Sequence, residues 1–139
     1  MIKIIKLLFF IFLVPSSLLA KNQYFEEGIN LFKNKKFEKA KFKFEQDIVI
    51  NPKSELSYLY LSKIFNNLDK KKLEEQNLNT VILLNPKNEE AIFSLAKLKL
   101  ESSDYNKSKE LNDRLISICK KFCNESNKLK IKIENLSKK

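Results

Sequence analysis

The chain contains no histidine, no tryptophan and only one glycine, Gly28, among its 139 residues. Histidine is the commonest general acid–base catalyst, so its absence removes the usual centre of such chemistry. A single glycine leaves no glycine-rich loop that could hold a phosphate group. Paired carboxylates such as Glu26 and Glu27 stand among lysines, as on a solvated helix face. We therefore expect no enzymatic activity, no catalytic residues and no cofactor.

Arginine is nearly absent as well, because Arg114 stands alone among 27 basic side chains, against 17 acidic ones. A net charge of +10 is compatible with nucleic acid, an anionic membrane surface or an acidic partner. Proteins that read nucleic acids rely on arginine for paired contacts with phosphate and guanine. The shortage of arginine therefore argues against a nucleic-acid partner.

Residues 1–20 differ in composition from the rest of the chain. Lys3 and Lys6 precede a continuous apolar stretch at residues 7–14, and Ala20 follows as a small residue at a cleavage position. This order is typical of a secretory signal peptide, so we expect cleavage after Ala20 and an exported protein, most simply in a bacterial periplasm. The alternative is an inner-membrane anchor formed by residues 1–20, although the apolar stretch is short against the ~20 residues of a spanning helix. A membrane partner is expected only in that case.

The only cysteines, Cys119 and Cys123, lie four residues apart. In an exported chain an even number of cysteines favours a disulfide. Within one continuous helix this separation fits disulfide geometry poorly, whereas across a bend the bond can form. Two alternatives remain, a disulfide that fixes the last helix or two free thiols. Two thiolates without histidine make an incomplete zinc shell, so we expect no metal site.

Residues 51–53 and 85–87 both read Asn-Pro-Lys and stand 34 residues apart. Proline has no N–H donor and clashes with the preceding turn, so each of them ends a helix. A fixed period of this length is typical of helix–turn–helix repeats. It predicts three repeats, at residues 21–54, 55–88 and 89–122.

Residues that lie 34 positions apart in this chain tend to share their size and polarity. An aromatic or apolar residue early in the first helix precedes a small residue, and the second helix brings another small residue, a large apolar one and a final proline. The first repeat has Tyr24, Gly28, Ala40, Phe44 and Pro52, the second Tyr58, Ser62, Leu78 and Pro86, and the third Ile92, Ala96, Ser108 and Leu115. The pattern resembles the tetratricopeptide repeat (TPR) family over residues 21 to about 122.

The resemblance implies an all-α fold, an α-α superhelix of three TPR-like helix pairs in one domain at residues 21–139. A capping helix is expected at residues 124–137, where Leu129, Ile133 and Leu136 recur at helical spacing. Ser54 and Asn88 are predicted to cap the helices that follow them.

Three positions depart from the family pattern. Glu74 stands where a small contact residue is expected, and Lys120 replaces the third proline. Asn112 takes the place of an aromatic residue, which predicts looser packing of the third repeat.

In the TPR family the first helices of successive repeats line a concave groove in which ligands lie. Carried over by position, the resemblance implies a partner-binding groove formed by Phe25, Ile29, Phe32, Lys33, Leu59, Tyr60, Lys63, Asn67, Phe93 and Lys97. The best-known clamp of the family for a terminal carboxylate uses lysine and asparagine at the positions of Phe25 and Ile29, so that clamp is not expected. An apolar floor flanked by lysines favours an apolar, acidic segment of a partner.

These features together predict an exported adaptor or scaffold that binds another cell-envelope protein in its groove. The alternative is a structural module that self-associates as a homodimer or is tethered to the membrane by its N-terminal segment.

Overall fold

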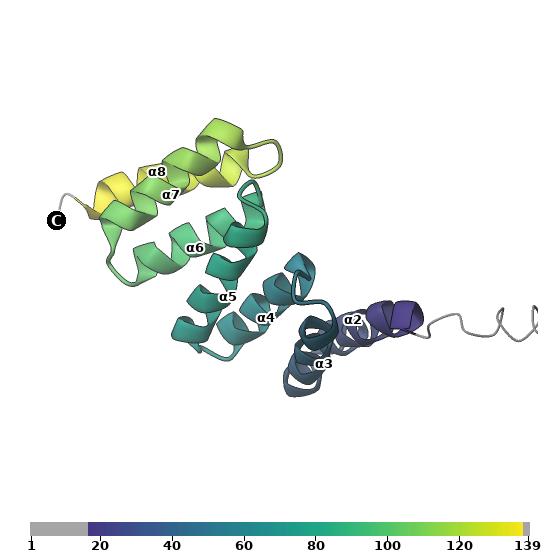
Figure 1. Ribbon diagram of the computed structural model, residues 1–139. Helices are drawn as coiled ribbons and strands as arrows, with labels where there is room; N and C mark the ends of the chain where they lie inside the picture. The colour runs from purple at the N-terminus through teal and green to yellow at the C-terminus, as the bar shows by residue number, and fades with distance from the viewer. Residues whose placement is uncertain (1–16, 138–139) are drawn as a thin grey trace, which may run out of the picture. The chain divides into compact units, whose positions relative to one another are not determined.

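The computed structural model describes residues 17–137, with side chains from residue 23 onwards. Within that range the regular elements are all helices and no strand is present, which confirms the predicted all-α class. The helices are α2 (Ser17–Lys33), α3 (Phe37–Ile50), α4 (Glu55–Asn67), α5 (Lys71–Leu84), α6 (Glu89–Glu101), α7 (Tyr105–Ile118) and α8 (Cys123–Leu136). Figure 1 labels them along the chain.

The helices fall into two compact units, Met1–Asn51 and Pro52–Lys139. The first unit contains the pair α2 and α3, which pack against each other. In the second unit α4 packs on α5, α5 on α6 and α6 on α7, while α8 lies beside α7 and also touches α6 (Figure 1). The expectation of a single domain at residues 21–139 stays a prediction.

The turn inside each helix pair has the same backbone geometry. Lys35, Asp69 and Ser103, which are 34 residues apart, have positive φ angles of 57°, 52° and 61°. The amide of the next residue donates five residues back, from Lys36 to Leu31, from Lys70 to Phe65 and from Asp104 to Lys99, at 2.9, 2.8 and 2.9 Å. This is the Schellman arrangement, which satisfies carbonyl groups left free at the end of a helix.

Packing in the first unit depends on the single glycine. A Cβ atom on Gly28 would lie 2.8 Å from the fully buried ring of Phe44. The absence of that atom lets α2 and α3 approach until Phe25 meets Phe44 edge-on, with ring centroids 5.8 Å apart. Gly28 therefore acts as the small contact residue that the repeat pattern predicts.

The second unit has a core of aliphatic side chains. They are Leu59, Leu78, Val81, Ala91, Ile92, Leu95, Ala96, Leu98, Leu100, Leu111, Leu115, Leu129 and Ile133. Members from α8 complete this core, so the last helix covers apolar surface that α6 and α7 would otherwise expose.

Polar side chains also enter the second unit, and each is bonded. The Ser108 hydroxyl donates to the carbonyl of Ala96 at 2.8 Å where α6 and α7 meet. Glu74, at the departure noted above, is buried and accepts from Asn66 Nδ2 at 3.1 Å. Burial raises the pKa of the Glu74 carboxyl, and the hydrogen bond from Asn66 opposes that rise.

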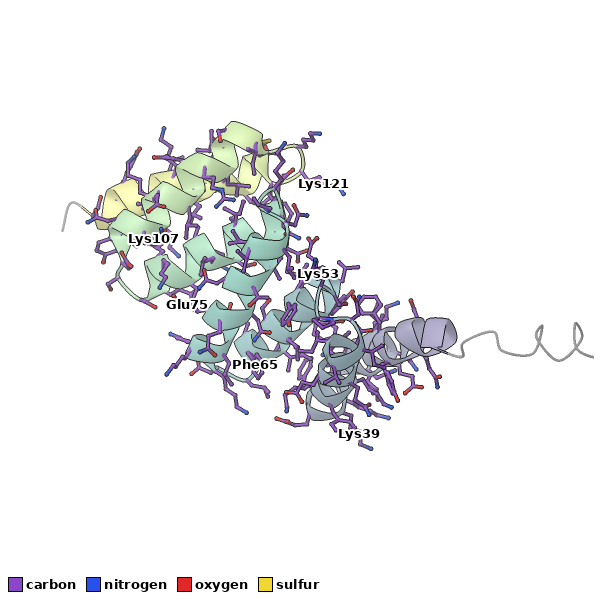
Figure 2. All side chains as sticks on the ribbon, viewed as in Figure 1. Lys39, Lys53, Phe65, Glu75, Lys107 and Lys121 are labelled. Atoms are coloured by element: carbon purple, nitrogen blue, oxygen red, sulfur yellow. A yellow bond between two sulfur atoms is a disulfide. The ribbon has the colours of Figure 1, made fainter. Side chains whose placement is uncertain are left out.

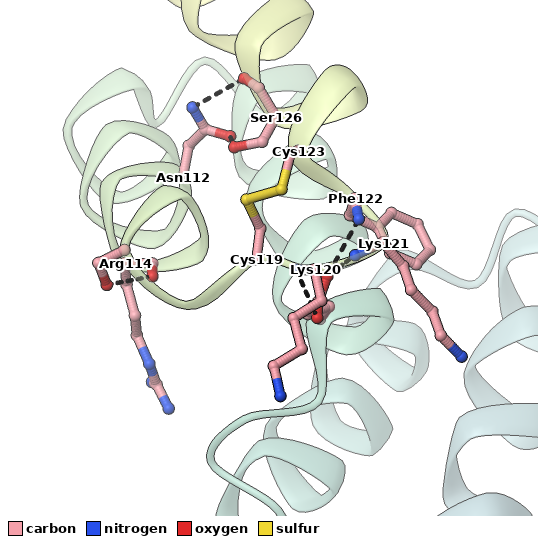
Figure 3. The surroundings of a disulfide bond; sticks show 10 residues. Asn112, Arg114, Cys119, Lys120, Lys121, Phe122, Cys123 and Ser126 are labelled. Atoms are coloured by element: carbon pink, nitrogen blue, oxygen red, sulfur yellow. Dashed lines mark hydrogen bonds between the residues drawn. A yellow bond between two sulfur atoms is a disulfide. The ribbon is translucent and has the colours of Figure 1, made fainter.

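Another departure, Asn112, does not loosen the third pair as predicted. Its side chain is 1% exposed. Its Nδ2 donates to the carbonyl of Ser126 at 3.1 Å, and its Oδ1 accepts from the Ser126 hydroxyl at 2.8 Å (Figure 3). The prediction is wrong because an amide can join α7 to α8 by two buried hydrogen bonds, which an aromatic ring could not form.

One of the two predicted helix caps is present. The Asn88 side chain accepts from the amide of Ala91 at 2.8 Å and caps α6. Ser54 forms no such bond, because its hydroxyl donates to the Ser57 hydroxyl at 3.0 Å instead. The prediction is therefore wrong for Ser54.

Lysines cover much of the surface. Figure 2 labels Lys39, Lys53, Lys107 and Lys121, all of which are exposed. Such an excess of positive charge favours encounter with acidic partners and disfavours encounter with basic ones.

Candidate functional site

The predicted groove residues of the first unit are largely engaged in its own packing. Phe25 is half-buried against Phe44, and Phe32 lies with its ring centroid 5.6 Å from that of Phe37. Ile29 is half-buried, while Lys33 is exposed at the end of α2. The apolar face predicted here therefore offers a partner only parts of these side chains.

The predicted residues on α4 have different surroundings. Leu59 is 5% exposed within the core cluster and offers almost no surface to a partner. Lys63 Nζ lies 5.0 Å from the centroid of the Tyr60 ring and 2.7 Å from Oε1 of Glu90 on α6. Asn67 is exposed, and its amide donates to the carbonyl of Lys63 at 2.8 Å. The charge of Lys63 is thus balanced inside the chain.

Phe93 and Lys97 line an open cavity between α6 and α8, called the α6–α8 groove below. Its volume is about 220 Å³. Its full lining is Phe93, Lys97, Leu100, Glu101, Glu125, Lys128, Leu129 and Lys132. The exposed lining is mainly apolar, with charged side chains from both helices.

The charged side chains that line the groove are not engaged in ion pairs within the described part of the chain. Lys97, Glu101, Glu125, Lys128 and Lys132 form no ion pair with any residue that the structure describes. All five are exposed. The groove therefore has three lysines that can still pair with carboxylates from outside.

The position of α8, which forms one wall of the groove, is fixed by the three residues that precede it. The Glu89 carboxylate accepts from the backbone amides of Lys120, Lys121 and Phe122 at 2.9, 2.8 and 3.0 Å. These hydrogen bonds, led by the one from Phe122, lower the pKa of Glu89. They tie the start of α8 to the start of α6.

Cys119 and Cys123 are joined in this same segment, with an S–S distance of 2.11 Å (Figure 3). The bond spans the bend between α7 and α8, which is the arrangement that permits a disulfide between cysteines four residues apart. Phe122, inside the bridged loop, places its ring centroid 5.5 Å from that of Phe93 at the groove.

The groove residues named from the sequence include Phe93 and Lys97, which line this cavity, and include no residue of α8. A signal was present, because Leu129 falls in phase with Leu95 and Leu61, and Ile133 falls in phase with Phe65. By this alignment α8 takes the place of the first helix of a fourth repeat. Its Lys128 and Lys132 therefore line the cavity together with residues of α6.

Other kinds of site have no support in the described part of the chain. From residue 17 to residue 137, no three His, Cys, Asp or Glu side chains gather as metal ligands would. None of the helices in that range is both long and apolar enough to cross a bilayer. The predicted signal peptide lies mostly at residues 1–16, outside the described range, and the expected cut after Ala20 falls within α2.

No protein-family model matches the chain, and no curated protein is similar enough to match. Solved structures do match. The first TPR of Spaghetti (RPAP3), bound to the HSP90 peptide SRMEEVD, is 16% identical with a TM-score of 0.77 over 87% of this chain and 95% of that chain. The TPR2B domain of yeast Sti1, in a complex with pHsp70, is 16% identical with a TM-score of 0.77 over 84% and 98%.

A third similar structure is bacterial. The Yersinia enterocolitica type III secretion chaperone SycD, in complex with a peptide of the translocator YopD, is 14% identical with a TM-score of 0.74 over 84% of this chain and 91% of that chain. Likeness at such low identity establishes the fold alone. The chain has the TPR fold, in the class of all-α, α-α superhelices.

Proposed function

We propose that this protein is a protein–protein interaction module, an adaptor or scaffold without catalytic activity, which binds a segment of another protein. The observation that carries the proposal is the α6–α8 groove, with its apolar lining and unpaired charges. Contiguous exposed apolar surface rimmed by polar groups is typical of a partner site.

The similar structures support the same kind of ligand. The Spaghetti domain holds an HSP90 peptide and SycD holds a peptide of YopD. A TPR fold can therefore present a surface on which a segment of another protein docks. Here we place the main contacts at Phe93 and Lys97. The contacts expected on α2 and on α4 stay predictions.

Peptide selection tests the function directly. A display library of random 12-residue peptides is panned against the purified protein, and selected peptides are compared before and after Phe93→Ala. We expect the substitution to remove most binding, because Phe93 lines the groove and is half-buried. Leu83→Ala is the matched control, since Leu83 is apolar, 81% exposed and absent from the groove lining.

Two results would contradict the proposal. If no peptide is enriched over an unrelated helical protein, binding of peptide segments is wrong. If Phe93→Ala remains helical by circular dichroism and keeps every ligand, the groove is not the site. Sedimentation over a concentration series runs in parallel, because the alternative of self-association predicts a dimer that forms as concentration rises.

We further propose that the protein is exported, most simply to a bacterial periplasm, and that its partner is another cell-envelope protein. The order of residues 1–20 supports export. Intact mass of the protein recovered from cells tests it, and the expected N-terminus is Lys21. Recovery of the uncleaved chain in membranes would instead support the alternative of an anchor at residues 1–20.

A further inference from the structure

We propose that the α6–α8 groove takes one large apolar side chain of the partner segment, and that Lys97, Lys128 and Lys132 bind Asp or Glu residues on either side of it. This inference rests on the proposed function, because it specifies the chemistry of the segment that the module binds.

The size of the groove limits what can enter. Sites for small molecules typically have volumes of about 300–1,000 Å³. The α6–α8 groove, at about 220 Å³, is smaller than that range and open to solvent. It therefore suits a single side chain inserted from a segment that lies across the surface, and it is too small to enclose a helix or a cofactor.

The lining selects an apolar side chain. Phe93 is half-buried, and Leu100 and Leu129 are each 6% exposed, so together they offer a small apolar floor. Burial of an aromatic or branched side chain there removes apolar surface from water on both partners. Aromatic side chains are the commonest anchors of this kind at interfaces.

The second repeat has a lysine at the position equivalent to Lys97, and that lysine pairs with a carboxylate. Lys63 on α4 and Lys97 on α6 are 34 residues apart and equivalent. Lys63 binds a carboxylate, that of Glu90 on the next first helix, at 2.7 Å beside the Tyr60 ring. The residue equivalent to Glu90 for Lys97 is Asn124, which carries no charge. Lys97 therefore lacks the ion pair that Lys63 forms, and a carboxylate of the partner segment can supply it.

Two lysines on α8 can bind carboxylates in the same way. Lys128 and Lys132 are four residues apart, so they lie on one face of the helix and both line the groove. With Lys97 they outnumber Glu101 and Glu125, and the chain as a whole carries +10. A segment with carboxylates flanking its apolar anchor matches this pattern, whereas lysine-rich segments are repelled.

Fluorescence anisotropy with three synthetic probes tests the inference on the purified protein. The first probe is fluorescein-labelled Ser-Glu-Asp-Phe-Glu-Asp-Ser, the second replaces the acids by their amides, and the third replaces Phe by Ser. We expect the first to bind at least tenfold more tightly than either of the others. Raising the salt concentration should weaken the first probe far more than the second.

Two triple variants distinguish the contribution of the groove lysines to affinity from that of the overall positive charge. Lys97→Gln/Lys128→Gln/Lys132→Gln removes the three lining charges, and we expect at least a tenfold loss of affinity for the acidic probe. The control is Lys53→Gln/Lys120→Gln/Lys121→Gln, which removes three exposed lysines outside the groove lining and should leave affinity within about twofold. Both variants have the same net charge.

The outcomes distinguish this inference from the proposed function. Equal binding of acidic and amide probes, or equal affinity of the two triple variants, overturns the inference. Peptides from the random library that still depend on Phe93 would then keep the proposed function. If instead the protein ignores all peptides and binds phosphatidylglycerol vesicles through the same lysines, the ligand is an anionic lipid surface and the inference is wrong.

Discussion

The connection between α5 and α6 and the connection between α7 and α8 are equivalent, 34 residues apart, and they are stabilised by different chemistry. At the first connection, the Glu55 carboxylate accepts from the side-chain amides of Asn85, at 2.9 Å, and of Asn88. Pro86 between them has no N–H to offer. Asparagine side chains supply the donors that the backbone lacks there.

At the second connection Lys120 replaces the proline, so the backbone regains its donor. Glu89, equivalent to Glu55, accepts three backbone amides there instead of two side chains. The disulfide between Cys119 and Cys123 closes the same bend. The comparison indicates that the glutamate at the start of the second and third pairs is the constant element, while its donors change with the residue at the proline position.

This difference bears on the groove, because α8 forms one of its walls. The end of the chain departs most from the repeat pattern, and it is also where buried hydrogen bonds, a carboxylate and a disulfide are concentrated. Loss of any of these links should therefore loosen α8 and the groove together, while the α5–α6 connection stays intact.

The largest effect is expected from Asn112→Ala. The substitution removes both hydrogen bonds to Ser126 and leaves a cavity in a buried position, which we expect to cost about 3 kcal/mol of unfolding free energy. Urea unfolding followed by circular dichroism measures the change. Ser117→Ala, at an exposed position of α7, serves as the control and should have little effect. A loss for Asn112→Ala below about 1 kcal/mol would mean that α8 is not held through this residue.

Removal of the disulfide is expected to have the next largest effect. A bridge between residues four apart closes a short loop, for which the chain-entropy model gives a stabilisation of about 2 kcal/mol. Cys119→Ser/Cys123→Ser should lower the urea midpoint accordingly, and reductant should lower it in the native protein but not in the variant. Alkylation of both cysteines without reductant would show instead that the thiols are free.

A smaller, pH-dependent effect is expected from Glu89. Because its pKa is lowered from 4.5 in the folded protein, its contribution is complete above about that value and is lost as pH falls through the folded pKa. Native protein should therefore lose stability on acidification below that point, and Glu89→Gln should lose less over the same range. Thermal unfolding between neutral and acidic pH measures both. Identical acid profiles would show that the carboxylate is not bound by the backbone amides.

Much of the fold was predictable from sequence because its determinants are local. Proline ends helices wherever it stands, so the two Asn-Pro-Lys segments located the ends of α3 and α5. Gly28 could be identified as a contact residue because the repeat compares it with Ser62 and Ala96. The all-α class followed from these local signals.

The site was harder to predict because it depends on partners distant in sequence. Lys63 and Lys97 look alike in the sequence, and only the contact with Glu90 separates a neutralised lysine from a free one. The donors to Glu89 are backbone amides, which every residue except proline carries, so no residue type marks them. Likewise Asn112 reads as a defect until Ser126 is found beside it.

The smallest change in stability is expected from glycine substitutions in the turns within the helix pairs. These turns share one backbone geometry, whereas the connections between pairs differ. Lys35 and Ser103 have the left-handed conformation that costs most residues about 1 kcal/mol and glycine little. Lys35→Gly and Ser103→Gly should each stabilise the protein by about 0.5 kcal/mol, less than the relieved strain because glycine also gains freedom when unfolded. Asp69→Gly should gain less, since aspartate tolerates this conformation.

Urea midpoints measure the stability of all three variants. Lys36→Gly is the control and should gain nothing, because the φ angle of Lys36 is −83°. A loss of stability in Ser103→Gly would show that its turn is held by its side chain, and that the three turns are alike only in backbone geometry.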